Sequence, residues 1–361
     1  GNVTAAYPSG PPTRQREIDG KSFMHRSHDQ RDISPPGVAA RLATFADRRL
    51  LSLLLLAYVT ATFLPAWGQT IRTTTAVPVP VPVLLLAVLL FIAGLGMDGD
   101  QLRESMRWKW LVIVGQVALW GGPLLVVAVL GRAADLFPPG LLPGLTLVAL
   151  MPTAASSVAW SQLSRGNVAL SLGLLATSTL LSPFLIYAVG RSELFATEGE
   201  LISSANSTVV SLVSWIIPAV IAGAGVRWLV GNERIRTIRP YIKLVSTAVL
   251  LTLNYANAAV ALPDLLAGSN WSALVAVAGS TVTMCSGGFL VGWLLTQAAG
   301  VEHGARRSFL FGMGMKNTGM ALVLAGMWFA SQPWAIVVII LYTLTQHVLA
   351  AAGHQQVCEP G

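Results

Sequence analysis

The sequence predicts an all-α polytopic membrane protein with ten transmembrane helices, arranged as two inverted five-helix repeats. Only 11% of the 361 residues are charged and 54% are hydrophobic, and apolar runs long enough to span a bilayer recur along the chain. A net charge of +7 would suggest nucleic acid for a soluble protein. Here the basic residues lie in short loops beside the apolar runs, so membrane topology accounts for them. We expect contact with the lipid bilayer and no nucleic-acid partner.

Polar segments flank the predicted membrane domain. Residues 1–47 are rich in Pro, Gly, Arg and Asp and lack helical periodicity, which predicts a disordered cytoplasmic tail. Met24 within this tail is a candidate start. The transmembrane domain is expected over residues 48–352, and a short C-terminal tail over 353–361. No cleavable signal is evident, because the first apolar run is long and lacks a small-residue cleavage site.

Ten apolar segments are predicted to cross the membrane: 50–66, 79–97, 110–130, 140–163, 167–189, 207–230, 241–262, 271–298, 307–329 and 333–352. The basic residues test this count. Thirteen of them flank the face predicted to be cytoplasmic: Arg48, Arg49, Arg103, Arg107, Lys109, Arg165, Arg227, Arg234, Arg236, Arg239, Lys243, Arg306 and Arg307. The opposite flanks hold Arg72, Arg132 and Arg191. This asymmetry places both termini in the cytoplasm, and we expect the membrane to be a bacterial inner membrane.

The fourth and ninth spans carry interruptions at equivalent places of the two halves. Five spans per half is an odd number, so the halves are inverted. The fourth span is broken at Met151–Thr153, because Pro152 removes a helix donor and clashes with the preceding turn. The ninth span is loosened by three glycines, Gly312, Gly314 and Gly319. Paired interrupted segments near the midplane point to the binding site of a secondary transporter, although Pro and Gly are also common in ordinary membrane helices.

The ninth span also carries a lysine at membrane depth. Lys316 lies about nine residues into the span, on the order of 14 Å, near the middle of a hydrocarbon core roughly 30 Å thick. A lysine there costs roughly 2.5–3.5 kcal/mol on insertion scales. Two interpretations are open: a functional group, and a charge that neutralises a packing partner. The glycines favour the first, because opened backbone at this depth is tolerated only where it is buried in protein or lines a cavity.

The two interrupted segments resemble the bile acid:sodium symporter (BASS) family of secondary transporters. The fourth span and its continuation read MPTAASSVAWSQLSRGNVALSLGLLATSTLLSP, which looks like the family's Pro-x-x-x-x-Ser-Asn-Val motif and the segment after it. The ninth span contains GMGMKNTGMAL, which looks like the family's Glu-x-Gly-x-Gln-Asn segment. The resemblance covers residues 50 to 352. It implies a panel domain formed by the first, second, sixth and seventh spans and a core domain whose fourth and ninth helices cross at the midplane. It also implies alternating access and no enzymatic activity.

The resemblance also implies where a sodium site would lie. Ser156, Ser157 and Ser171 fall at the positions of ligands of the family's first sodium site. Ser157 replaces the usual asparagine, and Leu175 stands where a threonine hydroxyl is usual. Gln116 in the third span is similar in position to another glutamine ligand.

The ninth span departs from the family pattern. Gly312 occupies the position of the glutamate that joins the two sodium sites, and Lys316 occupies that of a glutamine ligand. A protonated lysine has only donors and repels a second cation nearby. We therefore predict that Lys316 substitutes for sodium, with its ammonium touching carbonyls and hydroxyls such as those of Ser156 and Ser157. Transport is expected to be sodium-independent and to need no cofactor or metal. Proton coupling through Lys316 and facilitated diffusion both stay open.

The substrate is predicted to be a small organic anion. A fixed positive charge beside half-helix N-termini favours a carboxylate. By the resemblance, Asn317 lies at the crossover where substrate binds, beside Thr153 and Ala154 in the fourth span. Gln346 and His347 match a polar pair facing the same cavity. His347 is expected either to tune this charge or to be a neutral histidine in a helix interface.

Several alternatives remain at this stage. Sodium symport would use the serines and backbone carbonyls. An arsenite exporter would need a core cysteine, and Cys285 is a poor stand-in. A non-transporting receptor and an intramembrane enzyme are disfavoured, because neither a signalling domain nor a nucleophile–base pair is recognisable.

Asn254, Tyr255 and Asn257 are expected either to line the cavity or to hydrogen-bond between helices. The sequence does not choose the substrate, the direction of flux or the oligomeric state.

Overall fold

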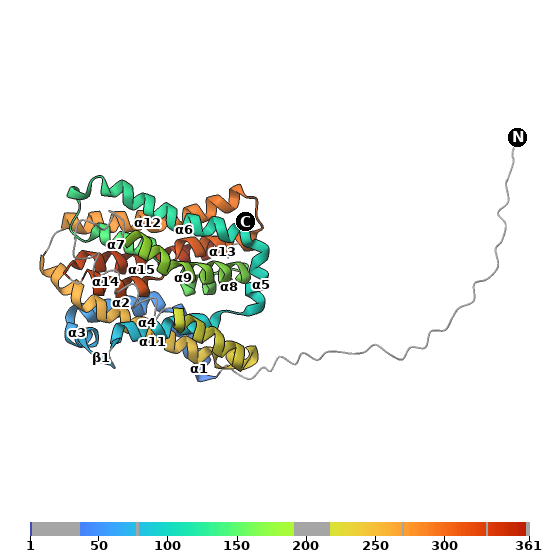
Figure 1. The fold of residues 1–361 in the computed structure, drawn as a ribbon, viewed down its shortest axis with the longest axis horizontal. Helices are drawn as coiled ribbons and strands as arrows, with labels where there is room; N and C mark the ends of the chain where they lie inside the picture. Colours follow the sequence, from blue (N-terminus) through green and yellow to red (C-terminus); the bar gives the residue numbers. More distant parts are fainter. Residues whose placement is uncertain (2–36, 77–78, 191–216, 269–270, 330, 359–361) are drawn as a thin grey trace. The chain divides into compact units, whose positions relative to one another are not determined.

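The computed structural model describes residues 1, 37–76, 79–190, 217–268, 271–329 and 331–358 (Figure 1). Residues 37–361 form one compact unit. The elements follow in chain order: α1 (Val38–Arg48), α2 (Leu50–Phe63), α3 (Pro65–Thr73), β1 (Thr75–Ala76), β2 (Val79–Pro80), α4 (Val81–Gly96), α5 (Gly99–Ser105), η1 (Met106–Trp108), α6 (Lys109–Gly131), η2 (Ala134–Leu136), α7 (Leu141–Leu150), α8 (Ala155–Leu163), α9 (Val168–Gly190), α11 (Asn232–Gly268), α12 (Trp271–Ala298), α13 (His303–Gly314), α14 (Thr318–Trp328) and α15 (Pro333–Cys358). A further helix covers Ile217–Val230. Strands β1 and β2 form a small antiparallel pair with Thr75 opposite Pro80.

The helices confirm an all-α membrane protein. In the described part of the chain, five helices are long and apolar enough to cross a membrane, and a sixth span is obtained if α2 and α3 form one bent crossing. These two helices meet at 94°. The bend has a local cause, because Leu64 precedes Pro65 and the ring of a proline disfavours helical backbone in the residue before it. The number of ten crossings and the inverted repeat stay predictions.

Helices extend into both predicted tails. Residues 38–47 of the predicted disordered tail lie in α1, and α15 continues past residue 352 to Cys358. α1 forms because it is amphipathic: Ala43 and Ala46 are buried, and the helix packs against α11. Periodicity over only eleven residues is a weak signal beside a long polar segment. Residues 2–36 lie outside the described part of the chain.

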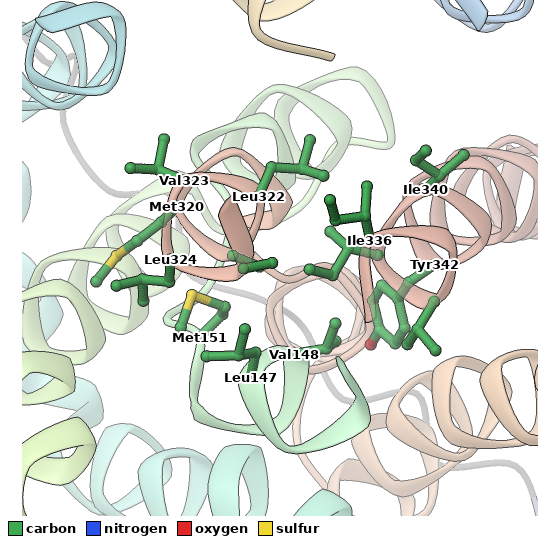
Figure 2. Close-up of a cluster of buried hydrophobic side chains, with 14 of the residues drawn as sticks. Leu147, Val148, Met151, Met320, Leu322, Val323, Leu324, Ile336, Ile340 and Tyr342 are labelled. Atoms are coloured by element: carbon green, nitrogen blue, oxygen red, sulfur yellow. The ribbon is translucent and has the colours of Figure 1, made fainter. Parts of the chain in front are cut away.

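The largest hydrophobic core surrounds the two interrupted segments. Figure 2 shows a part of it, in which side chains of α7, α14 and α15 converge, among them Leu147, Leu324 and Ile336. α7 packs against both α6 and α15, and α12 packs against α13 and α15. The helix ends at the interruptions are therefore enclosed by protein, where each backbone polar group needs a partner inside the fold.

Candidate functional site

Two helix interruptions lie against each other at the centre of the site. The first separates α7 from α8 at residues 151–154, and the second separates α13 from α14 at residues 315–317. Thr153 and Lys316 form an isolated antiparallel β-bridge. Asn317 N donates to Pro152 O at 2.8 Å, and Ala154 N donates to Met315 O at 2.9 Å. Each interruption thus supplies backbone partners to the other.

Pro152 explains why α7 stops where it does. Without an N–H, Pro152 cannot continue the helical ladder to Val148, and Met151 N bonds Val148 O at 3.1 Å instead. Thr153 N turns away to Ser178 Oγ, at 3.1 Å. The carbonyl of Ala149, which Thr153 N would satisfy in a continuous helix, is therefore left for another donor.

That donor is the ammonium of Lys316. Its Nζ donates to Ala149 O at 3.3 Å and to Met151 O at 3.4 Å, both at the C-terminal end of α7. This end carries the negative pole of the helix dipole and favours a cation. The Lys316 side chain is 1% exposed. Among the described residues, no carboxylate forms an ion pair with Lys316.

The third acceptor of the ammonium comes from a second helix defect. Lys316 Nζ lies 2.5 Å from Leu119 O in α6. In an unbroken helix this carbonyl would accept from the N–H of residue 123, but residue 123 is a proline inside α6. Pro123 thus frees the carbonyl of α6 that accepts from the lysine. With three carbonyls around it, the ammonium has an acceptor for each of its three N–H groups.

The end of α13 is capped by neutral hydroxyls instead. Thr153 Oγ1 donates to Gly312 O at 3.0 Å, and Tyr342 Oη donates to Gly314 O at 3.2 Å. The backbone N–H of Lys316, which would reach Gly312 O in a continuous helix, donates to Gln346 Oε1 at 2.9 Å. The two bridge partners, Thr153 and Lys316, therefore each place a side chain on the helix end of the opposite segment.

Among the described residues, the serines at the sodium-ligand positions and Gln116 form no hydrogen bond with the ammonium of Lys316. The predicted hydroxyl contacts of Ser156 and Ser157 with the ammonium are wrong: its partners are carbonyls, because the helix interruptions leave those carbonyls without backbone donors. Ser157 Oγ and Ser171 Oγ are buried and have no hydrogen-bond partner among the described residues. Gln116 Nε2 bonds Thr177 Oγ1 at 2.7 Å and Leu174 O at 3.3 Å, and its Oε1 has no partner in the same part of the chain.

The side chain of Leu174 lies close to Gly312. A Cβ built on it would lie 2.9 Å from Cδ1 of Leu174, closer than real Cβ contacts come. A carboxylate side chain at this position would thus require Leu174 to move.

The predicted substrate residues lie around the crossover and differ in burial and in their hydrogen-bond partners. Thr153 and Ala154 are buried, and both are engaged in the contacts between the interruptions. Asn317 is half-buried and caps α14, with Oδ1 accepting from Met320 N at 3.1 Å. Gln346 Oε1 is occupied by Lys316 N. His347 Nδ1 lies 2.7 Å from Thr343 O, and its Nε2 is buried without a partner among the described residues.

The polar residues of α11 hydrogen-bond within and between helices. Asn254 Oδ1 accepts from Tyr58 Oη of α2 at 2.7 Å, and Tyr255 Oη donates to Leu64 O at 2.6 Å. Asn257 Nδ2 donates to Leu253 O in the same helix at 2.8 Å. Of the two expectations for this segment, these contacts fit helix association.

Sequence reasoning missed three contributors: the carbonyl of Leu119, the hydroxyl of Ser178 and the hydroxyl of Tyr342. A signal for the first existed, since a proline within a helix always frees the carbonyl four residues earlier. The position of the other two depends on which helices lie beside the interruptions.

Comparison with known proteins gives consistent matches. A family model described as the SBF-like CPA transporter family matches residues 48–353. The "uncharacterized sodium-dependent transporter YocS" of Bacillus subtilis is 27% identical over 240 residues, which cover 66% of this chain and 71% of the relative. The "probable sodium/metabolite cotransporter BASS1, chloroplastic" of Arabidopsis thaliana is 24% identical over 253 residues, which cover 67% of this chain and 58% of the relative.

The family match extends from the start of the first apolar helix to the last and includes both interrupted segments. It agrees with the resemblance that the interrupted segments carry. The protein therefore belongs to the SBF-like CPA transporter family, and it is an integral membrane secondary transporter of the SBF/BASS kind and not an enzyme.

Proposed function

We propose that the protein transports a small organic anion without sodium, and that the ammonium of Lys316 takes the place of the sodium ions. One observation carries this proposal: Lys316 Nζ is buried and shared among the carbonyls of Leu119, Ala149 and Met151. Carbonyl oxygens of interrupted helices are the groups that coordinate small cations in transporters of this general type. Here a tethered cation already occupies them.

The same lysine makes binding of a further cation unfavourable. Two positive charges about 4 Å apart repel by about 4 kcal/mol at the effective dielectric constant of a protein. The carboxylate that would offset a second charge is missing, because Gly312 stands at that position and Leu174 fills the space beside it.

The ammonium of Lys316 and the N-termini of α8 and α14 favour an anionic substrate. α8 and α14 both begin at the crossover, with Ala154 and Asn317 as their N-caps. Helix N-termini favour anions, and Lys316 adds a positive charge with no carboxylate counter-ion among the described residues. We place the substrate carboxylate near Asn317, with His347 Nε2 as a further polar contact.

The proposed architecture is that of ten crossings in two inverted repeats, with both termini cytoplasmic. The interrupted segments are the fourth and ninth crossings and meet at the midplane. Transport then requires the core domain, which holds the interruptions, to move against the panel domain in alternating access. Proton coupling and facilitated diffusion both fit this scheme. A bacterial inner membrane is the proposed location.

A second candidate, sodium-coupled symport, is favoured by a specific observation. Ser157 Oγ, Ser171 Oγ and Gln116 Oε1 are buried oxygens without hydrogen-bond partners in the described part of the chain. Unsatisfied buried oxygens are rare and would suit a cation. One matched relative is also named as sodium-dependent.

Thermal stability across a sodium titration at constant ionic strength separates the two candidates. A ligand that binds only the folded state raises stability by about 2.7 kcal/mol at a hundred times its Kd. We expect the midpoint of thermal unfolding of the wild-type protein to be the same in sodium buffer and in choline buffer. A sodium-specific rise that Ser157→Ala abolishes would establish the symporter and refute the lysine proposal.

Flux of labelled carboxylates into proteoliposomes tests the substrate class. We expect uptake that is equal in sodium and choline buffers and is lost in Lys316→Gln. Lys109→Gln is the matched control, because Lys109 is exposed at the start of α6. Uptake that persists in Lys316→Gln would show that the lysine is only a packing residue.

A further inference from the structure

The far end of α14 is capped by an arginine from a distant part of the chain. α14 begins at the crossover and ends at Trp328, so Gly326 lies in its last turn, where the helix itself supplies no donor for the carbonyls. Arg72, in the last turn of α3, donates from Nη2 to Gly326 O at 2.9 Å. This end of a helix carries the negative pole of the dipole and favours a cation. Arg72 therefore stabilises the end of α14 that is remote from the crossover.

The absence of a side chain at Gly326 lets the guanidinium come this close. A Cβ built on Gly326 would lie 3.1 Å from Arg72 Nη2 and 3.3 Å from Asn257 Oδ1, closer than most real Cβ contacts. The hydrogen bond is partly buried, and a bond shielded from water is electrostatically stronger than an exposed one. Glycine at this position thus leaves room for the bond from α3 beside the side chain from α11.

In the proposed architecture this bond joins the two domains that move. α3 completes the first span and belongs to the panel domain, whereas α14 belongs to the ninth span and to the core domain. α4 and α11, which are also panel helices, pack against α14. By the distribution of basic residues along the sequence, Arg72 lies at the non-cytoplasmic end of its span. The panel and the core are therefore in contact at the outer end of their interface.

A second arginine connects the panel and the core at the cytoplasmic end. Arg239 Nη2 of α11 donates to Gln162 Oε1 of α8 at 3.1 Å, and this bond is exposed. A cavity of ≈ 360 Å³ lies beside it, between α1, α8 and α11. Of the two contacts, the outer one is the more enclosed.

We propose that Arg72 closes the outer end of the transport pathway, and that the bond from Arg72 to Gly326 O is an outer latch. The latch must open before the core can move away from the panel on this side. Because α14 runs from Asn317 at the crossover to Gly326, the latch fixes the segment that carries a proposed substrate residue. Arg72 is a positioning residue, which acts through α14. The inference rests on the proposed movement of the core against the panel, and it does not depend on sodium or on the identity of the substrate.

A cysteine in place of Val323 provides a probe of opening at this end. Val323 is 2% exposed, and it lies four residues after Gly319 and three before Gly326, so the three share one face of α14. A Cβ on Gly319 would lie 3.6 Å from Leu253 of α11 and from Leu89 of α4, which shows that this face is turned towards the panel. Figure 2 shows Val323 pointing away from the side chains of α7.

The test is labelling of the purified full chain carrying Val323→Cys with a charged maleimide in lipid nanodiscs. The protein without this substitution gives the background from Cys285 and Cys358. Adding Arg72→Gln is expected to raise the labelling rate by about tenfold or more, because a hydrogen bond from a charged donor shifts an equilibrium by at least this factor. Gly326→Ala is a second variant that keeps the charge: its methyl group would crowd the guanidinium, so the rate is expected to rise there too.

The matched control is Arg239→Gln, which removes the same charge and the other bond between panel and core. The labelling rate of Val323→Cys is expected not to rise in this variant, because the bond lies at the opposite end. An equal rise would mean that both arginines merely hold the fold together, and it would overturn the latch. Measurable labelling that is the same with and without Arg72 would refute the latch and leave the movement of the core intact. Labelling at the background level in every variant would refute both the latch and the proposed movement.

Discussion

The ends of α7 and α13 meet the same structural problem with different chemistry. Both helices stop inside the core, and both leave carbonyls that continuous helix would have satisfied. Thr153 of the first interruption caps α13 through a hydroxyl, and Lys316 of the second caps α7 through an ammonium. The two residues are bridge partners. The interruptions thus exchange caps, and only one of the two caps carries charge.

This difference shows where the special character of the site lies. A hydroxyl donates one hydrogen bond and adds no charge. Each hydroxyl at the end of α13 therefore satisfies one carbonyl and leaves the local charge unchanged. The ammonium donates three, and it gathers carbonyls from α6 as well as from the end of α7. Lys316 therefore connects three elements, and the charge that it brings in is the charge that a bound cation would bring.

Removing the ammonium is expected to have the largest effect on stability. Lys316→Met keeps an unbranched side chain that is one atom shorter, and it leaves three buried carbonyls without their donor, each at about 1–3 kcal/mol. Release of a buried charge, roughly 2.5–3.5 kcal/mol on insertion scales, offsets part of this loss. We expect a net loss of about 3 kcal/mol in the free energy of unfolding, measured by denaturant titration in detergent. The exposed Lys109→Met serves as control and is expected to change little.

A double-mutant cycle with Pro123 tests why the lysine reaches α6. Pro123→Ala restores an N–H four residues after Leu119, so the Leu119 carbonyl regains a helical partner. In that background Lys316→Met is expected to be less destabilising, by about 1–3 kcal/mol. The coupling energy comes from the unfolding free energies of the four proteins. Additivity to within about 0.5 kcal/mol would mean that the Leu119 contact contributes nothing.

Much of this arrangement was predictable from local sequence. Pro152 and the glycines of the ninth span indicated the interruptions, and the depth of Lys316 indicated a site. The partners of the lysine were not predictable, because they depend on which helices lie beside the interruptions. Ser156 and Ser157 were expected as partners since they are near in sequence, but the lysine takes carbonyls that have lost their own donors.

Elsewhere in the fold, too, features with a local cause were predictable and features that depend on tertiary contacts were not. The bend between α2 and α3 has a local cause in Pro65, whereas α1 is stabilised by packing of Ala43 and Ala46 against α11. A helix of eleven residues is marginal by itself, so its existence depends on a tertiary contact that the sequence does not display. The absence of a carboxylate at position 312 could be seen in the sequence. The position of the Leu174 side chain beside Gly312 could not, because it depends on how the two helices pack.

The smallest effect is expected at the neutral cap. Thr153→Val conserves shape and leaves Gly312 O without its hydroxyl donor, so we expect a loss of about 1 kcal/mol in the free energy of unfolding. Thr146→Val in α7 is the matched control, because the Thr146 hydroxyl bonds Leu142 O four residues earlier, a carbonyl that already accepts a helical N–H. A larger loss at Thr153 than at Thr146, yet well below that of Lys316→Met, would support the distinction between the caps. Equal losses at Thr153 and Lys316 would show that the charge of the ammonium adds nothing to its stabilising effect as a cap.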